Sequence, residues 1–351
     1  MSIFAVLKPN AVITDVEEVF LTVAQNRGHE AFVFTARDVD FIKMKISGKT
    51  IRNGQIVQEY FDFPDIIQNR LAVKKEDKET YLKLAEMIPF TSNRVGTKKQ
   101  VDIKLRAIEE IKEFLIDVEN CNSVEQIIVA LKSNKKIILK PVSGNQGKGI
   151  YTLEENDNLI KIKKLEECIE IKKEQLNLFF EENIKSRGYA ISPSFKSLTV
   201  NNFNTVFRMQ INRGVNGKWQ LIKFFPYINI DQNIDITNGM QGALITLREK
   251  MFLEQYYPTC YKEIEKKIQK LFKVFPLEFQ KKYLWRLDSL GLDLGIDQSG
   301  NIVIFEVNAG PGIGFMAFPV AKAQVQYYEW LKEKAVKPYI NNFLSVHDKN
   351  R

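Results

Sequence analysis

The stretch from Trp285 to Phe315 constrains the fold of this chain most, because it reads as a strand hairpin that runs into a glycine-rich loop. The segment Asp297-Gln298-Ser299-Gly300 has the residues that favour a tight turn, and Ile302–Val307 is a β-branched and aromatic run typical of a strand. Side chains alternate between the two faces of a strand. The pattern therefore predicts that one face of the second strand carries Ile304, Glu306 and Asn308.

This hairpin has the groups that a divalent cation needs. If Ile296 pairs with Asn301, Asp293 lies opposite Ile304 and diagonal to Glu306. Diagonal neighbours are about 7–8 Å apart, so both carboxylates could reach one ion. Mg²⁺ prefers oxygen ligands, and two carboxylates with the Asn308 amide leave coordination positions for nucleotide phosphates. The alternative is an ordinary hairpin with a polar solvent face, although such a face rarely ends an apolar strand in Glu-x-Asn followed by Ala-Gly-Pro-Gly.

Composition excludes several classes of protein. A chain of 351 residues with 44% hydrophobic and 27% charged residues predicts two or three globular domains. It has no apolar run of membrane-spanning length and no signal peptide, so we expect a cytoplasmic protein without a membrane partner. Three widely spaced cysteines and two histidines argue against disulfides, a zinc site and a histidine base. The net charge of +8 suits a nucleotide ligand, and without a recognition motif we expect no nucleic-acid partner.

Periodicity predicts the order of the elements. Residues 1 to about 75 read as strand, helix and strand with a later hairpin, which indicates a small α/β unit. Helical spacing continues over Gln100–Ile116, and Ser123 has N-cap chemistry for a further helix. Leu159–Ser186 reads as a long charged helical region. The segments 206–211 and 219–227 read as a hairpin, and two helices are expected at about Glu254–Phe272 and Pro319–Phe343.

A second glycine-rich segment lies in the middle of the chain. The expected strand Ile137–Pro141 leads into residues 142–151, which hold three glycines in six residues, so successive N–H groups could cradle a phosphate. It is not a P-loop, because Gly149 follows Lys148 where Ser or Thr is required. Lys140 could pair with phosphates, whereas Lys148 could equally be a solvated loop residue. Arg208, inside an apolar strand, is either a phosphate or substrate clamp or a surface residue.

Together these motifs resemble the ATP-grasp superfamily, and most closely its spore-coat-associated (YheC/YheD-like) branch. The resemblance rests on FTARDV, FPDIIQNRL, ILKPVSGNQGKGI and LDLGIDQSGNIVIFEVNAGPG, in that order along the chain. It implies an α/β (α+β) fold in which an N-terminal leader domain precedes two subdomains that clasp ATP. The implied domains are residues 1–88, 89–188 and 189–351.

The resemblance also implies roles for individual residues. ATP would be bound by Lys98 or Lys99, Lys140, Ser143, Gly144, Asn145, Gln146, Gly147, Lys148 and Gly149, with the adenine along Tyr189, Ala190, Ile191 and Ser192. Mg²⁺, or Mn²⁺ in its place, would be bound by Asp293, Glu306 and Asn308. Arg208 and Lys140 would be catalytic, and the substrate would lie near Asn238, Gly242 and Gly310. The chain departs from the family pattern at Val206, where Asp is common, at Ser192, where Glu or Gln is common, and at Ala243, where a second glycine is expected.

The function implied is that of an ATP-dependent carboxylate–amine ligase that forms an amide or peptide bond through an acylphosphate. The alternatives are a kinase of a small molecule on the same scaffold, or a nucleotide-binding spore-coat-associated protein without turnover. The expected partners are a carboxylate and an amine, each a small molecule or a peptide. A cytoplasmic or spore-associated location is implied, and the sequence gives no indication of oligomeric state.

Overall fold

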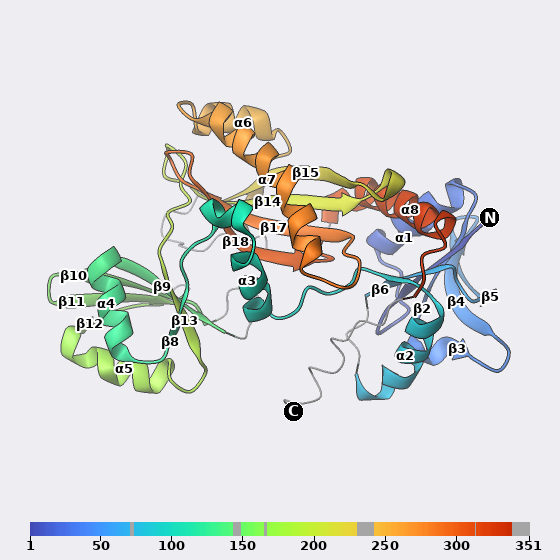
Figure 1. Cartoon of the computed structure of the whole chain (residues 1–351), viewed down its shortest axis with the longest axis horizontal. Coiled ribbons are helices and arrows are strands. Elements are labelled where there is room, and N and C mark those ends of the chain that lie inside the picture. The colour runs from blue at the N-terminus through green and yellow to red at the C-terminus, as the bar shows by residue number, and fades with distance from the viewer. Residues whose placement is uncertain (71–73, 143–148, 165–166, 230–241, 313, 339–351) are drawn as a thin grey trace.

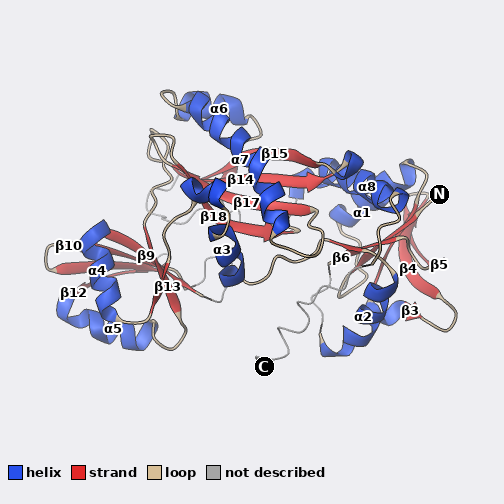
Figure 2. Ribbon diagram, in the orientation of Figure 1, coloured by secondary structure: helices blue, strands red, loops and turns tan. Residues whose placement is uncertain are grey.

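The computed structural model describes residues 1–70, 74–142, 149–164, 167–229, 242–312 and 314–338. Within that part the chain forms three separate sheets, each with its own helices. Figure 1 shows the sheet that contains β14 and β17 in the middle, with the leader sheet on one side and the sheet of β9–β13 on the other. Figure 2 shows helices on each of these sheets. The expected mixed α/β architecture is confirmed.

The leader sheet is formed by the first ninety-one residues and has the order β3-β4-β2-β1-β6-β7, with β5 paired to β4. Helix α1 (Asp15–Asn26) and the last helix of the chain cover one face, and α2 (Lys78–Met87) covers the other. The central strand β1 is wholly buried from Phe4 to Leu7. The other elements are β1 Ile3–Leu7, β2 Glu30–Phe34, β3 Val39–Asp40, β4 Lys45–Arg52, β5 Gln55–Asp62, β6 Ile66–Asn69 and β7 Phe90–Thr91, with short 3-10 helices at Ala36–Asp38 and Lys75–Asp77.

The second sheet corrects one prediction. Leu159–Ser186 is not one helical region: β11 (Leu159–Lys164) and β12 (Glu167–Lys172) precede a 3-10 turn at Lys173–Gln175 and the short helix α5 (Leu176–Asn183). In β11 isoleucine alternates with lysine, and Ile160 and Ile162 are buried, so a period of two determines the structure. The sheet order is β12-β11-β10-β9-β13-β8, built from β8 Glu119–Cys121, β9 Lys136–Pro141, β10 Tyr151–Asn156 and β13 Tyr189–Pro193. Helix α4 (Val124–Asn134) starts at Ser123, as expected, in a capping box with Gln126.

The third sheet has the order β16-β15-β14-β17-β18. One face packs on α3, α6, α7 and the 3-10 helix Glu109–Phe114. The expected helix Glu254–Phe272 is in fact two helices, and the one expected at Pro319–Phe343 runs from 317 to 333. The bounds are β14 Asn204–Arg213, β15 Trp219–Asn229, β16 Leu244–Ile245, β17 Ser289–Ile296, β18 Ile302–Ala309, α3 Lys98–Arg106, α6 Glu249–Tyr256, α7 Tyr261–Lys281 and α8 Ala317–Glu333, with 3-10 turns at Val215–Gly217 and Gly314–Met316.

The three units are interwoven in sequence. Strand β13 follows the predicted boundary at residue 188 but lies in the second sheet, and α8 packs on the leader sheet next to α1. The leader unit is tied to the third sheet by Asp288, which is 3% exposed and accepts a hydrogen bond from the Ser92 backbone N–H at 2.7 Å. The domain limits of 1–88, 89–188 and 189–351 stay a prediction.

Asp288 should make stability depend on pH. Burial raises the pKa of its carboxyl to about 6, against the lowering effects of the Ser92 N–H and of Arg213. A raised folded pKa means that the folded state binds the proton more tightly, so stability falls as pH rises from about 4 to about 6, by about 3 kcal/mol in total. Asn cannot titrate, so the free energy of unfolding of Asp288→Asn should rise by about 3 kcal/mol relative to that of the parent between pH 4 and pH 7. Urea unfolding of both proteins at the two pH values measures this difference. A difference that did not change with pH would contradict this.

Candidate functional site

The hairpin that carries the predicted metal ligands forms with a different register from the one predicted. The turn closes from the Asp297 N–H to the Asn301 carbonyl at 3.1 Å, so Ile296 pairs with Ile302 rather than with Asn301. The register then shifts between Leu294 and Asp293, which brings Glu306 directly opposite Asp293. The extra residue in the second strand is a β-bulge.

This bulge also corrects the predicted faces. Ile304 lies in the hydrophobic core with Ile302 and Val307, whereas Glu306 and Asn308 are outside that core. Simple alternation had placed Ile304 on the same face as Glu306. A bulge inserts one extra residue, so the alternation of side chains between the two faces shifts by one residue after Phe305. The two metal candidates therefore share a face with Asp293 without exposing Ile304.

Two carboxylates and an amide meet on this face of the sheet. Asp293 and Glu306 are direct cross-strand partners, and Asn308 Nδ2 lies 3.4 Å from Asp293 Oδ2. Arg208 on the adjacent β14 donates from Nε to Asp293 Oδ1 at 2.6 Å and from Nη2 to Oδ2 at 3.2 Å. Burial raises the pKa of Asp293, and Arg208 opposes that shift. Neither hydrogen bond uses Arg208 Nη1, which is therefore available to an anion.

The bulge residue Phe305 connects the hairpin to the second sheet. A Cβ on Gly295 would collide with the ring of Phe305, so glycine makes room for it on the face that carries Asp293. The ring meets Phe195 edge-on at 6.1 Å, and Lys140 Nζ lies 5.7 Å from its centroid. Burial lowers the pKa of Lys140, Lys98 lowers it further, and Glu306 opposes both. Phe305 therefore lies between the hairpin and Lys140 of the second sheet.

Of the two candidate lysines, Lys98 is the one that points toward this site. Thr97 caps α3 in a capping box with Gln100, which fixes Lys98 as the first helical residue. Lys98 Nζ lies 3.4 Å from Glu306 Oε1, while Lys99 is exposed and the structure shows no ion pair for it in the described part. Cations are unfavourable in the first turn of a helix. Helix stability therefore does not explain Lys98, whose charge is paired with that of Glu306.

In β13, the strand expected to line the adenine, only alternate side chains face the hairpin of β17 and β18. Tyr189 and Ile191 lie in the core of the second sheet, under α4 and α5. Ala190 is the cross-strand partner of Lys140, and Ser192 pairs with Ile138 on the same side of the sheet. Side chains on that side face the hairpin, so Tyr189 and Ile191 could meet a nucleotide only through their backbone.

Other predicted residues lie at the edges of the described site or outside it. Ser143, Gly144, Asn145, Gln146, Gly147, Lys148 and Asn238 lie outside the described residues. Gly149, the last residue of the expected phosphate-binding segment, has φ +78°, and Gly242 has φ +74°; both values are strained for other residues. Gly310, just past β18, has φ +53° and donates its N–H to the Ser289 carbonyl at 2.9 Å. Gly310 thus follows directly on the strand that carries Glu306 and Asn308.

Sequence reasoning missed Gly291. It is the cross-strand partner of both Asn308 and Gln210. A Cβ at this position would lie 2.8 Å from Pro311 Cγ and 3.3 Å from Arg208 Nη1. Gly291 therefore leaves room for the arginine and for the loop after β18. The signal in the sequence was a glycine two residues before Asp293, in an otherwise apolar strand.

The side chains present fit a hard divalent cation. Asp293 is largely buried, with its side chain 17% exposed, and its ionised form requires nearby positive charge, which Arg208 supplies and a bound cation would add to. Glu306 and Asn308 add oxygen donors on the same face. Among the described residues no group of three acidic, histidine or cysteine side chains could hold a metal. Two carboxylates and one amide are what the protein offers, with room for phosphate and water oxygens.

Comparison with known proteins gives the family of the chain. The profile of the family "YheC/D like ATP-grasp" matches residues 87–335, well over half of the chain. The chain belongs to this ATP-grasp family. The match covers α3, the second sheet and the hairpin of the third sheet, so it includes Lys98, Lys140, Arg208 and Asp293. The fold expected from the resemblance is confirmed.

Individual relatives are distant. The chain is 22% identical over 343 residues to the endospore coat-associated protein YheD of Bacillus subtilis (strain 168), covering 90% of this chain and 74% of YheD. The fold is similar to that of a RiPP-associated ATP-grasp ligase from Chryseobacterium gregarium, solved with ADP and a leader and core peptide (TM-score 0.54, 10% identity, 97% and 99% coverage). It is also similar to the ATP-grasp ligase PsnB, solved with a minimal precursor (TM-score 0.52, 13% identity, 92% and 98% coverage). Among the described helices none is long and apolar enough to cross a membrane.

Proposed function

We propose that this protein is an ATP-dependent carboxylate–amine ligase that forms an amide bond through an acylphosphate. The observation that carries the proposal is the convergence of Asp293, Glu306 and Asn308 with Arg208 and Lys140 on facing sheets. Two cationic side chains, together with a metal ion bound by the carboxylates and the amide, would neutralise the charge of a nucleotide polyphosphate. Because positioning and charge neutralisation are the main requirements of phosphoryl transfer, the protein needs no nucleophilic side chain.

The proposed reaction has two steps. A substrate carboxylate oxygen attacks the γ-phosphorus, the bond to the β,γ-bridging oxygen breaks, and ADP leaves. The amine then attacks the acylphosphate carbonyl carbon, phosphate leaves with the bonding electrons, and the nitrogen loses a proton to solvent. Bound Mg²⁺ would supply charge neutralisation of the phosphates at Asp293, Glu306 and Asn308. Lys140 and Arg208 Nη1 would stabilise the negative charge on the transferring group.

Hydroxylamine trapping tests this reaction. With ATP, Mg²⁺ and a panel of carboxylates, we expect ADP to form and an acyl hydroxamate to accumulate for the carboxylate that serves as substrate. A kinase would instead form ADP with a stable phosphate ester and no hydroxamate. Nucleotide binding without ADP formation from any carboxylate, amine or hydroxyl acceptor would contradict catalysis altogether.

The two neighbouring lysines offer a matched pair of variants. If Lys98 binds phosphate oxygens, Lys98→Ala should raise the KM for ATP about tenfold to a hundredfold, the effect of one lost charge-assisted hydrogen bond. Lys99→Ala removes the same charge one residue away and should leave KM near the parent value. The measurement is initial-rate ADP release against ATP concentration. Equal effects of both substitutions would contradict the assignment of Lys98.

Peptide substrates are a reasonable first choice. Two similar folds were solved with peptides, a leader and core peptide in one and a minimal precursor in the other, and Gly310 is exposed directly after β18. Either the carboxylate or the amine could therefore be carried by a peptide side chain. The name of the relative YheD supports a spore-coat association, which mass spectrometry of purified spore coats would test. Absence of the protein from the coat fraction would argue against that association.

A further inference from the structure

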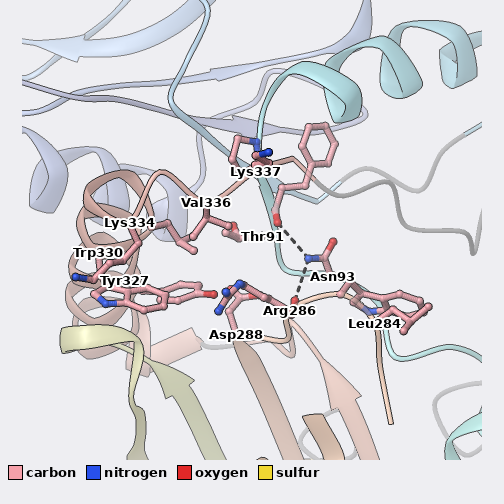
Figure 3. Close-up of a pocket in the computed structure, with 14 residues that line it drawn as sticks. Thr91, Asn93, Leu284, Arg286, Asp288, Tyr327, Trp330, Lys334, Val336 and Lys337 are labelled. Carbon is pink, nitrogen blue, oxygen red and sulfur yellow. Dashed lines mark hydrogen bonds between the residues drawn. The ribbon is translucent and has the colours of Figure 1, made fainter. Parts of the chain in front are cut away.

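A cavity separate from the hairpin lies where the leader unit meets the third sheet. It has a volume of about 410 Å³ and is lined by residues around β7, by the segment before β17 and by the end of α8 (Figure 3). Asp288 borders this cavity and precedes Asp293 by five residues of strand, which span about 17 Å at about 3.3 Å per residue. A ligand here would therefore not touch the reacting phosphates.

Asp288 gives the cavity a buried acceptor. Its Oδ1 is bonded to the Ser92 N–H at 2.7 Å, but its Oδ2 is buried without a hydrogen-bond partner among the described residues. The side chain of Arg213 donates to the Leu287 and Gly217 carbonyls and to Gln280, and it forms no hydrogen bond with Asp288 Oδ2 among the described residues. Tyr327 reaches toward Asp288 from α8 (Figure 3). A buried carboxylate oxygen without a donor is uncommon and calls for a partner.

The rim of the same cavity is cationic. Arg286, Lys334 and Lys337 line it and are exposed, against the single carboxylate of Asp288. The Arg286 guanidinium lies 5.6 Å from the ring of Trp330, which fixes its position over the wall. Glu333 lies 3.5 Å from Lys334, and no carboxylate of the described residues forms an ion pair with Arg286 or Lys337. The excess of positive charge favours an anion.

We propose that this cavity binds a small organic anion of the hydroxy-acid or amino-acid class. The anionic group would be bound by Arg286, Lys334 and Lys337, and a hydroxyl or ammonium group of the ligand would donate to Asp288 Oδ2. The body of the ligand would pack against Trp330 and Tyr327. The volume lies within the range of about 300–1,000 Å³ that small-molecule sites have.

Tryptophan fluorescence tests this site without requiring ATP turnover, so its failure is separable from failure of the proposed ligase. The chain has three tryptophans, and Trp219→Phe leaves Trp285 and Trp330, both in the wall of the cavity. The probes are matched: L-malate and L-aspartate each carry a donor that succinate lacks. Phenyllactate and 3-phenylpropionate form a second pair, in which only phenyllactate has the hydroxyl donor and both have a phenyl ring to pack against the aromatic wall.

We expect a saturable fluorescence change for at least one donor-bearing probe, with a Kd at least about tenfold lower than that of its donor-free partner. Arg286→Gln, at an exposed position, should weaken that binding at least about tenfold, while Lys322→Gln on the exposed side of α8 should not change it. Equal binding of succinate, no saturable change for any probe, or an unchanged Kd in Arg286→Gln would each overturn the proposal.

Discussion

Glu306→Gln is expected to lower the rate of ADP formation about a thousandfold, or about 4 kcal/mol of transition-state stabilisation. The substitution keeps the shape of the side chain and removes only its charge. Glu306 lies opposite Asp293, where the cation that neutralises the phosphates would bind. Because Glu306 is 37% exposed, we expect the thermal unfolding temperature to change little. The measurement is steady-state ADP release at saturating ATP and Mg²⁺.

Glu59→Gln is the matched control for this variant. Glu59 is a carboxylate of similar exposure, 39%, that pairs with Arg52 at 3.0 Å in the leader sheet. It therefore loses a comparable surface ion pair far from the hairpin and should keep the activity of the parent. If Glu306→Gln also kept that activity, the assignment of Glu306 as a metal ligand would be wrong.

Arg208→Gln should have the largest effect on stability among the site residues. It leaves the largely buried Asp293 without the two hydrogen bonds, at 2.6 and 3.2 Å, that balance its charge. Breaking a buried ion pair in this way costs about 3–5 kcal/mol. At pH 7 the loss of folding free energy cannot much exceed about 4 kcal/mol. That is the cost of protonating a carboxyl group at this pH, and a protonated Asp293 no longer needs a cationic partner. We expect urea unfolding to show a loss of this size.

The same variant makes two further outcomes measurable. Burial already raises the pKa of Asp293, and loss of Arg208 should raise it further. A raised folded pKa favours the folded state as pH falls, so the variant should regain stability relative to the parent between pH 8 and pH 5. Mg²⁺ should raise the unfolding temperature of the variant more than that of the parent. A stability difference insensitive to both pH and Mg²⁺ would contradict the view that Asp293 faces a cation site.

The sequence predicted the elements of the site because its strongest signals are local. Turn residues at Asp297–Gly300, a glycine-rich segment after Lys140 and the Glu-x-Asn ending are readable without tertiary contacts, and the family match covers all of them. The order of these motifs was enough to predict the ATP-grasp fold. Their chemistry indicated which side chains should converge.

What could not be read from the sequence depends on tertiary packing. The Phe305 ring fits beside Gly295 on the paired strand and contacts Phe195, which is distant in sequence, so simple alternation gave the wrong register. Lys98 and Lys99 are chemically identical, and only the direction of α3 separates them. The Ile-Lys alternation of β11 was present in the sequence, but the high charge of that region made a helical reading attractive.

The departures from the family pattern lie at two different places in the fold. Val206 lies on β14 opposite Tyr227, two residues from Arg208, and Ser192 is buried on β13. Neither contacts the carboxylates of the hairpin through any ion pair or hydrogen bond in the described part of the chain. Restoring the common residue with Val206→Asp should therefore change acceptor use more than the KM for ATP. Measuring both constants for the parent and the variant distinguishes the two effects.

A crystal soaked with Mn²⁺ and a non-hydrolysable ATP analogue tests the central claim most directly. Anomalous scattering should show a metal about 2.0–2.3 Å from oxygens of Asp293, Glu306 and Asn308, with nucleotide phosphates between that metal and Lys140. A nucleotide bound elsewhere, or an ordered nucleotide with no metal at these three side chains, would contradict it.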